Sequence, residues 1–235
     1  MLNRTTPLRS IEIDELYSDN QNHSIDQFNK VSTVQNNNII SIFGEKTADA
    51  KSEVKVILTD DRDLLQKYYE LRHYAYRDEN GWKDYNGYEN ENDRNGRIAV
   101  AIQDGEVVGG MRLMFSDECE HMSNEIAGTK YNYREIMTKY DKRENLVFSE
   151  ISAIAVAKKN RDRSVTTRMF DLLLSESKKH QCNYMFGVGV AVVCREYRMI
   201  FRSLGHDVEI VISFPWKQRE TYNLARMFPM YTKFQ

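Results

Sequence analysis

The chain has 235 residues, which is enough for one full domain and an appendage and excludes a large multidomain assembly. Hydrophobic residues make up 41% of the chain, and the charged residues, at 29%, are mixed along it, so we expect a packed core rather than a disordered chain. The net charge of −2 provides no overall attraction to nucleic acid or to an anionic membrane. We therefore expect no nucleic-acid partner.

The sequence carries no sign of membrane insertion, export or metal binding. No stretch approaches the roughly 18 apolar residues of a membrane helix, and the first residues lack the apolar segment of a signal peptide. We expect a cytoplasmic protein without an integral membrane segment. Cys119, Cys182 and Cys194 are an odd number without a CxxC pair, and the five histidines show no metal-ligand spacing, so we expect buried thiols and no metal.

The chain changes character near residue 53. Hydrophobic residues are sparser before that point than after it, and the early part carries the run Asn36-Asn37-Asn38 and only short apolar patches. Such a composition is typical of a segment that buries little surface. We therefore divide the chain into a weakly ordered N-terminal extension, residues 1–52, and one folded domain, residues 53–235.

From residue 53 onward, strand and helix periodicities alternate. Asp60 or Asp61 is expected to cap the first helix, and Asp104-Gly105 to form the turn of a hairpin. The first predicted elements, in chain order, are a strand (53–58), a helix whose apolar stripe is Leu64, Tyr68, Leu71 and Ala75, an Asn-rich polar loop (80–95), two hairpin strands (97–102 and 106–115) and a short helix near 133–140.

The second half of the domain continues the alternation. Its predicted elements are a strand (146–156), a helix (161–180), a strand (183–190), a helix that ends at Gly205 (194–205) and a final strand (206–214). The order β-α-β-β-(α)-β-α-β-α-β is an α/β (α+β) arrangement. It predicts a mixed sheet with helices on its faces, where a ligand binds between diverging strands.

Two polar groups accompany the first helix and the loop after it. Arg72 and Tyr76 are four residues apart and share one helix face, so Arg72 needs an acidic partner or must extend to solvent, while Tyr76 and Trp82 are either core residues or part of a cleft. Glu89, Glu91 and Asp93 follow in the polar loop. They either line a site for a cationic substrate or solvate the loop.

Charged residues also occur within two apolar strands. Arg112 lies in GGMRLMF, and strict alternation places Glu150 on one face of its strand with Phe148, Ser152 and Ile154. A carboxylate buried there costs several kcal/mol unless it is paired. Glu150 is therefore either the partner of an arginine or an acid–base group with a raised pKa, and the two roles can coexist.

A basic segment follows the same strand. Acyl-CoA enzymes hold a pyrophosphate at such a place with a glycine-rich turn and free N–H groups. This turn has no glycine and is basic instead, so it is either a solvated face or a docking patch for an acidic partner. Its basic residues are Lys158, Lys159, Arg161, Arg163 and Arg168.

Four motifs in this order, LR-x3-Y-x4-GW, E-x-D, VxGGxRL and SEIS-x-I-A-V, resemble the acyl-homoserine-lactone (autoinducer) synthases, a branch of the GNAT-type N-acyltransferases related to the N-acyl amino acid synthases. The resemblance extends from about residue 53 to residue 211. It implies a GNAT-like, mainly antiparallel central sheet with helices on both faces. It also implies an enzyme that makes a quorum-sensing type of signal.

The resemblance assigns roles to individual residues. The catalytic set that it implies is Glu150, Arg112 and Ser152, with Glu150 as the base that deprotonates the amine. The substrate-binding set is Arg72, Tyr76 and Trp82 around the amine and the thioester, Glu91 and Asp93 on the amine side, and Phe148. We expect the fatty chain among Met111, Leu113, Phe148, Met185 and Phe186.

Two positions depart from the family pattern. Ala153 replaces the arginine that follows the serine, and Asn95 and Gly96 stand where a further aspartate follows Asp93. Both changes remove charged side chains from the polar network on the amine side. The expected acceptor is an amino acid or S-adenosylmethionine, and a simple amino acid suits the reduced network better.

The basic turn favours acyl carrier protein over CoA as donor, docked on Lys158, Lys159, Arg161 and Arg163. We expect no cofactor beyond the acyl thioester co-substrate. Two other hypotheses remain open from the sequence. One is a non-catalytic fatty-acyl or carrier-protein binding member of the fold, and the other is a CoA-dependent acetyltransferase.

Overall fold

The computed structural model describes residues 52–116, 141–210 and 227–234. All of these residues except Ser52 belong to one compact unit, Glu53–Gln235. Three predictions lie mostly or wholly outside these residues: the N-terminal extension, the short helix near 133–140 and the end of the final strand. No helix in the described ranges is both long and apolar enough to cross a membrane.

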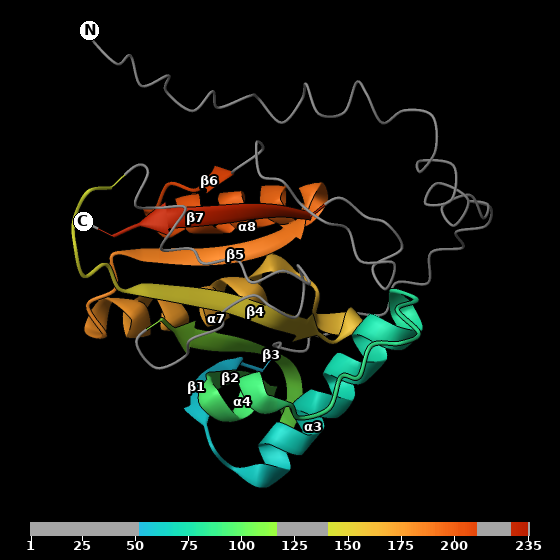
Figure 1. Cartoon of the computed structure of the whole chain (residues 1–235). Helices are drawn as coiled ribbons and strands as arrows, with labels where there is room; N and C mark the ends of the chain where they lie inside the picture. The colour runs from blue at the N-terminus through green and yellow to red at the C-terminus, as the bar shows by residue number, and fades with distance from the viewer. Residues whose placement is uncertain (1–51, 117–140, 211–226, 235) are drawn as a thin grey trace, which may run out of the picture. The chain divides into compact units, whose positions relative to one another are not determined.

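The domain is built on one seven-stranded sheet with the order β1-β2-β3-β4-β5-β7-β6 (Figure 1). Its strands are β1 (Lys55–Thr59), β2 (Arg97–Gln103), β3 (Glu106–Phe115), β4 (Phe148–Val156), β5 (Tyr184–Val190), β6 (Glu209–Ile210) and β7 (Met227–Lys233). Among these described strands only β4 and β5 pair in parallel, and every other neighbouring pair is antiparallel. The predicted mixed, mainly antiparallel sheet is confirmed.

Local sequence signals explain several element ends. The side chain of Asp61 accepts hydrogen bonds from the backbone N–H groups of Asp63 and Leu64, which caps the first helix. Asp104 and Gly105 both have positive φ, at 53° and 78°, as the two-residue turn of a twisted hairpin requires. Gly205, with φ of 80°, follows the end of the last helix.

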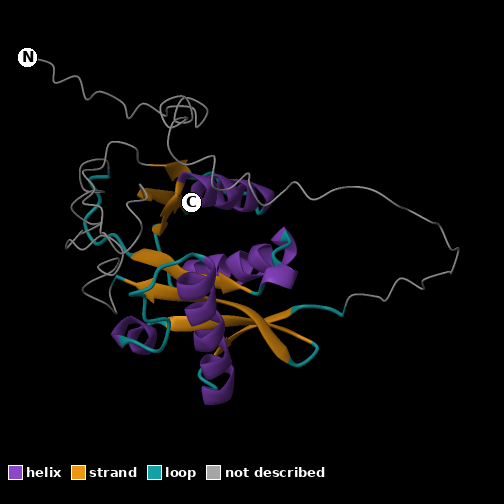
Figure 2. Cartoon of the chain, turned by 90° about the vertical axis from the view of Figure 1, so that its right-hand side faces the viewer, coloured by secondary structure: helices purple, strands orange, loops and turns teal. Residues whose placement is uncertain are grey.

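Helices cover both faces of the sheet, as predicted (Figures 1 and 2). They are α3 (Arg62–His73), the π-helix η2 (Tyr74–Glu79), α4 (Glu91–Asn95), the 3₁₀ turn η3 (Lys158–Asn160), α7 (Arg163–Lys179) and α8 (Ala191–Ser203). On the α3 face, Tyr68 and Tyr69 pack with Ile98 and Val100. On the opposite face, α7 and α8 cover the larger core cluster.

The central strand β4 is bulged. Between the pairs Gly110–Ala155 and Arg112–Ser152, β3 has one intervening residue and β4 has two, Ala153 and Ile154. The extra residue reverses the alternation of side chains after Ser152. As a result Ile154 packs with the α7–α8 core and Ala155 with the α3 cluster, so the predicted place of Ile154 on the Glu150 face is wrong.

Two elements differ from the sequence prediction. The loop expected at 80–95 contains the short helix α4. Strand β7 was not predicted, and it lies between β5 and β6, where Pro229 pairs with Val188. A proline argues against a central strand on sequence grounds, since it removes a ladder donor.

The two described cysteines, Cys182 and Cys194, are buried as predicted, whereas Cys119 lies outside the described residues. Burial raises the pKa of the Cys194 thiol to about 12, although a hydrogen bond with the Gly189 backbone partly opposes the shift. Cys194 is therefore an uncharged core residue at neutral pH.

Candidate functional site

Arg72 is completely buried on α3 and contacts the polar loop that follows. Its Nη1 and Nη2 donate to the two carboxylate oxygens of Asp93 at 2.8 and 2.7 Å. Nε donates to the Gly87 carbonyl and Nη2 to the Tyr88 carbonyl, both at 2.8 Å. The acidic partner that the sequence required for Arg72 is thus Asp93, and Arg72 ties the loop to α3 rather than extending to solvent.

Asp93 and Asn90 form the capping box at the start of α4. The Asn90 side chain accepts from the Asp93 N–H, and the Asp93 carboxylate accepts from the Asn90 N–H at 3.0 Å. Burial by itself would raise the pKa of Asp93, but hydrogen bonds from Arg72 and the charges of Arg72 and Arg112 outweigh it, so that its pKa is lowered. Asp93 is therefore a buried, ionised carboxylate.

Arg112 extends this cluster from the loop to the central strand. Its Nη1 donates to Asp93 at 3.1 Å and to the Asn90 side chain at 3.3 Å, and its Nε donates to the Ser152 hydroxyl at 3.1 Å. We name the set Arg72, Asp93, Arg112 and Ser152 the polar cluster. It joins α3, α4, β3 and β4, four elements that are far apart in sequence.

Glu150 lies two residues before Ser152 and is only 2% exposed. The parallel pairing of β4 with β5 covers three positions and ends at Glu150 and Phe186, although both strands continue beyond this point. Glu150 therefore stands where the two strands separate. Phe148 lies next to Phe186, with ring centroids 5.6 Å apart.

The bulge of β4 lies just past this point. Ala153 adopts a φ of 54°, in the left-handed region that is unfavourable for a residue with a Cβ. Two tyrosine hydroxyls donate to consecutive carbonyls there: Tyr68 to Ala153, and Tyr76 to Ile154 at 2.9 Å. Both tyrosines come from the segment α3–η2 on one face of the sheet.

The other predicted substrate-binding residues of the helix and the loop do not all belong to one cluster. Tyr76 packs against Trp82 and Tyr85, with ring centroids 4.9 and 4.7 Å away, so the predicted aromatic pair is brought together. Glu91 is exposed on α4 and is not part of the polar cluster. Glu89 is exposed as well, so among the three acidic loop residues only Asp93 is buried.

The residues expected around the fatty chain divide between the two faces of the sheet. Met111, Leu113 and Met185 belong to the core beneath α7 and α8. Phe148 packs with Phe186 beside the parting of β4 and β5. The five residues therefore do not share one face of the sheet, because side chains of adjacent strand positions point to opposite faces.

All five basic residues of this segment are exposed, and its three arginines form ion pairs. Arg161 bonds to Glu79 and to the Val156 carbonyl, and Arg163 Nε donates to Glu196 at 2.9 Å. Arg168 contacts Glu53 at 3.2 Å. Lys158 and Lys159 are exposed on η3.

The helix that follows this segment is capped by a carboxylate. The side chain of Asp162 accepts from the Ser164 N–H at 3.1 Å and also from the Ser164 hydroxyl. Asp162 therefore places negative charge at the start of α7, where a pyrophosphate would otherwise be attracted.

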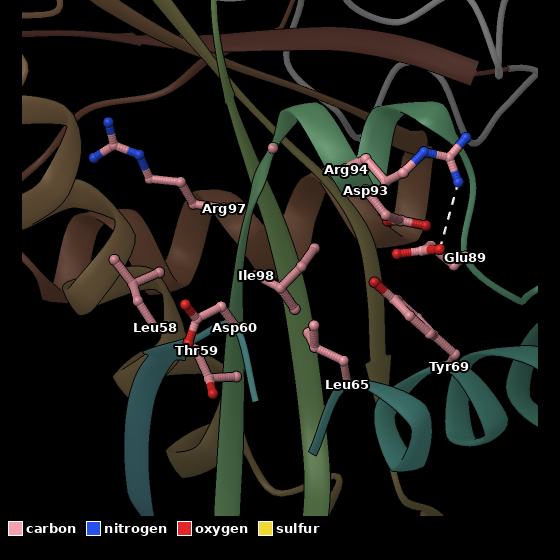
Figure 3. A pocket seen from close by; sticks show the side chains of 11 residues that line it. Leu58, Thr59, Asp60, Leu65, Tyr69, Glu89, Asp93, Arg94, Arg97 and Ile98 are labelled. Atoms are coloured by element: carbon pink, nitrogen blue, oxygen red, sulfur yellow. Dashed lines mark hydrogen bonds and ion pairs between the residues drawn. The ribbon is translucent and has the colours of Figure 1, made fainter. Parts of the chain in front are cut away.

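A surface pocket of about 420 Å³ lies between the end of β1, α3 and α4 (Figure 3). Leu65, Ile98 and Tyr69 form its apolar side, and the ion pair of Arg94 with Glu89 at 3.4 Å lies beside it. Of the polar cluster only Asp93 lines it, and Glu150 does not. The pocket is thus separate from the predicted base.

Sequence reasoning missed three contributors to this region. The sequence predicts Tyr68 only as a member of an apolar stripe and gives neither Asn90 nor Asp162 a role. The signal for Asn90 was present, since Asn followed three residues later by Asp is a variant of the capping box. No local signal identifies the Tyr68 contact, which spans 85 residues of sequence.

No family model and no curated protein matches the sequence. Solved structures resemble its fold. The acyl-homoserine-lactone synthase LasI shares 16% identity with a TM-score of 0.52, covering 77% of this chain and 90% of that one. FeeM, an N-acyl amino acid synthase from uncultured soil microbes, shares 10% identity with a TM-score of 0.53 over the same fractions.

A third similar structure is BjaI, a CoA-dependent acyl-homoserine lactone synthase, with 15% identity and a TM-score of 0.51 over 78% of this chain and 84% of that one. At such identities the likeness establishes the fold alone. The resemblance inferred from the motifs is thereby confirmed at that level: the described chain has the GNAT-type fold of the acyl-homoserine-lactone and N-acyl amino acid synthases.

Proposed function

We propose that this protein is an N-acyltransferase that moves a fatty acyl chain from acyl carrier protein to the amino group of a small acceptor. The product is an acyl-homoserine lactone or an N-acyl amino acid. The observation that carries the proposal is the position of Glu150, a buried carboxylate where β4 and β5 part, on a fold shared with enzymes of this chemistry.

The reaction assigns one proton transfer to Glu150. An acceptor ammonium gives a proton to the carboxylate, directly or through a water, and the free amine then attacks the thioester carbonyl carbon. The tetrahedral intermediate gives up one of the two protons left on the attacking nitrogen as the C–S bond breaks, and this proton goes to the departing sulfur, so that an amide and a carrier thiol form. The proton held by Glu150 passes to solvent, so the carboxylate is regenerated.

The polar cluster supports this role by fixing the strand that carries Glu150. Arg112 bonds to Ser152, two residues further along β4, and is itself held by Asp93. In this structure the Arg72 guanidinium donates to Asp93, two backbone carbonyls and the Tyr68 hydroxyl. Its proposed contribution is therefore to position the loop and β4, rather than to bind the substrate directly.

The acceptor that we propose is a small amine, either an amino acid or S-adenosylmethionine. Ala153 lacks the charge that an arginine at this position would carry, and Gly96 offers no side chain at all where the resemblance implies a carboxylate. An acceptor with fewer charged groups needs fewer partners. These two positions favour the amino acid.

The proposed donor is acyl carrier protein, and two features of the turn before α7 favour it over CoA. The Asp162 carboxylate already accepts the Ser164 N–H and would repel a pyrophosphate. Lys158 and Lys159 are exposed and suit an acidic protein surface. BjaI, on the same fold, is CoA-dependent, so acyl-CoA belongs in the comparison as a competing donor.

The test is mass spectrometry of lipid extracts from cells that express the protein or its Glu150→Gln variant. We expect an acylated amine with the intact protein and a loss of product of about 100-fold or more with the variant, because general base catalysis contributes roughly 10²–10⁴-fold. The product would identify both the chain and the acceptor.

The matched control is Glu144→Gln, an exposed glutamate shortly before β4 that should leave product formation unchanged. Normal turnover by folded Glu150→Gln protein would remove Glu150 from the mechanism. Absence of any new acylated amine from cells with folded wild-type protein and ample acyl carrier donor would contradict the enzyme proposal and favour a fatty-acyl binding protein.

A further inference from the structure

Two tyrosine hydroxyls hold two consecutive carbonyls of the central strand. Tyr68 donates to Ala153 and Tyr76 donates to Ile154 at 2.9 Å. These are the two β4 residues that face a single residue of β3, and so they form the bulge itself. The carbonyls of a bulge fall out of the regular ladder and need other donors.

The bulge is unfavourable without such help. Ala153 adopts a φ of 54°, and its Cβ makes that left-handed conformation costly. A conformation of this kind persists only where surrounding contacts determine it. In the described structure the two phenol groups donate hydrogen bonds to the carbonyls of Ala153 and Ile154.

Both tyrosines are themselves firmly placed. Tyr68 lies flat against β3, where a Cβ at Gly110 would approach its ring to 2.2 Å, so only glycine leaves room for it. Arg72 Nη1 donates to the Tyr68 hydroxyl at 3.5 Å, and the guanidinium carbon lies over the Tyr68 ring, 5.2 Å from its centroid, which links Tyr68 to the polar cluster. Tyr76 belongs to the π-helix η2 and packs against Trp82 and Tyr85.

We propose that Tyr68 and Tyr76 are positioning residues, a hydroxyl clamp that holds the β4 bulge in one conformation. The bulge follows Glu150 and Ser152 and lies where β4 no longer pairs with β5. The clamp therefore fixes the backbone against which the thioester carbonyl must be held while Glu150 deprotonates the amine. This catalytic consequence rests on the proposed function, whereas the clamp itself does not.

The protonation state of the two tyrosine hydroxyls agrees with their role as hydrogen-bond donors. Burial raises the pKa of the Tyr68 hydroxyl, with the charge of Arg72 opposing the shift, and burial raises the pKa of Tyr76 well above its usual value. Both hydroxyls therefore stay protonated, and able to donate, across the physiological range of pH.

The first test does not depend on activity. Hydrogen exchange of the full chain is measured for the segment 148–157 in wild type, Tyr68→Phe and Tyr76→Phe, with Tyr74→Phe as the matched control because Tyr74 is 54% exposed. We expect faster exchange at 148–157 in the first two variants, unchanged exchange in β2, and wild-type behaviour in the control. Wild-type exchange at 148–157 in both variants would overturn the clamp.

The second test measures kinetics once a donor and an acceptor are known. Misplacement of the reacting groups should lower kcat by about 10- to 100-fold in Tyr76→Phe while KM for the amine stays near the wild-type value. A purely structural residue would instead reduce the fraction of folded enzyme. A wild-type kcat would overturn the positioning role, whereas an inactive wild type would contradict the proposed function and leave the exchange result to decide the clamp.

The substitution Ala153→Gly should partly compensate for the loss of a tyrosine hydroxyl. Glycine adopts the left-handed conformation without the cost of a Cβ, so the bulge should then depend less on the hydroxyls. We expect Tyr68→Phe to lower kcat less in the Ala153→Gly background than in the wild-type background. Equal losses in the two backgrounds would mean that Tyr68 does not act through Ala153.

Discussion

Arg72 directs both ends of its guanidinium into the protein: toward Asp93, toward the carbonyls of Gly87 and Tyr88, and toward the Tyr68 hydroxyl. A buried arginine in this arrangement stabilises the fold only while its carboxylate partner is present. Removing one member of such a pair is far more costly than losing an exposed ion pair, because the other charge is left buried.

Asp93→Asn should therefore lower the free energy of unfolding by about 3–5 kcal/mol, as measured by urea denaturation at neutral pH. The matched control is Glu91→Gln on the exposed side of the same helix, which should change stability by no more than about 0.5 kcal/mol. Equal, small effects of the two substitutions would contradict the description of Asp93 as a buried ionised partner.

The same pair contributes to the dependence of stability on pH in acid. The folded-state pKa of Asp93 lies below its ordinary value of 3.8, so its contribution is fully present above that value and is lost as pH falls below it toward the folded pKa. Asp93→Asn removes this titration. The acid limb of its stability profile should accordingly be flatter than that of wild type.

At the scale of elements, the loop between α3 and β2 illustrates how a polar segment becomes part of the core. The sequence predicts a loop without regular structure here, whereas the structure contains the short helix α4. The loop backbone at Gly87 packs directly on α3. A Cβ at Gly87 would lie 2.2 Å from the Cα of His73, which is backbone and cannot move aside cheaply. Gly87 also provides the carbonyl that accepts from Arg72 Nε.

Gly87→Ala should consequently destabilise the protein by about 1–3 kcal/mol through overpacking and lower its melting temperature. Gly105→Ala is a useful comparison, because that position has a φ of 78° and nothing within 4 Å of an added Cβ. Its cost, about 1 kcal/mol, comes from the backbone alone. Only Gly87→Ala should also accelerate hydrogen exchange in α4; a uniform effect of both variants would argue against docking at Gly87.

For the molecule as a whole, the exposed arginines of the basic segment form ion pairs with carboxylates of the same chain, and Lys158 and Lys159 are exposed beside them. We therefore expect Lys158 and Lys159 to contribute most to binding of the proposed carrier protein. The paired Arg161 and Arg163 offer less free charge.

The double charge reversal Lys158→Glu with Lys159→Glu should lower kcat/KM for an acyl carrier donor by about tenfold at low salt, with a smaller difference at high salt. The rate with a small soluble acyl thioester should not change. Lys178→Glu, an exposed reversal near the end of α7, serves as control. Equal losses with the carrier donor and the small thioester would show that the two lysines do not dock a carrier.

The sequence by itself determined what depends on neighbouring residues: the alternating strand and helix periods, a helix cap at Asp60 or Asp61, the Asp104-Gly105 turn and a helix end at Gly205. The family motifs also single out all four residues of the polar cluster, Arg72 and Asp93 as substrate-binding residues and Arg112 and Ser152 as catalytic ones, and the structure places the four in contact. Tertiary structure alone decided which of three acidic residues pairs with Arg72, because that choice depends on how the loop docks on α3.

The bulge and β7 were likewise decided by contacts distant in sequence. Alternation within β4 predicts one face for Phe148 through Ile154, but an extra residue opposite β3, stabilised by hydroxyls from α3 and η2, reverses the pattern after Ser152. Strand β7 carries a proline and forms only because β5 and β6 pair with it from both sides. Local propensity cannot predict either feature, since the partners that stabilise them are separated from them by tens of residues.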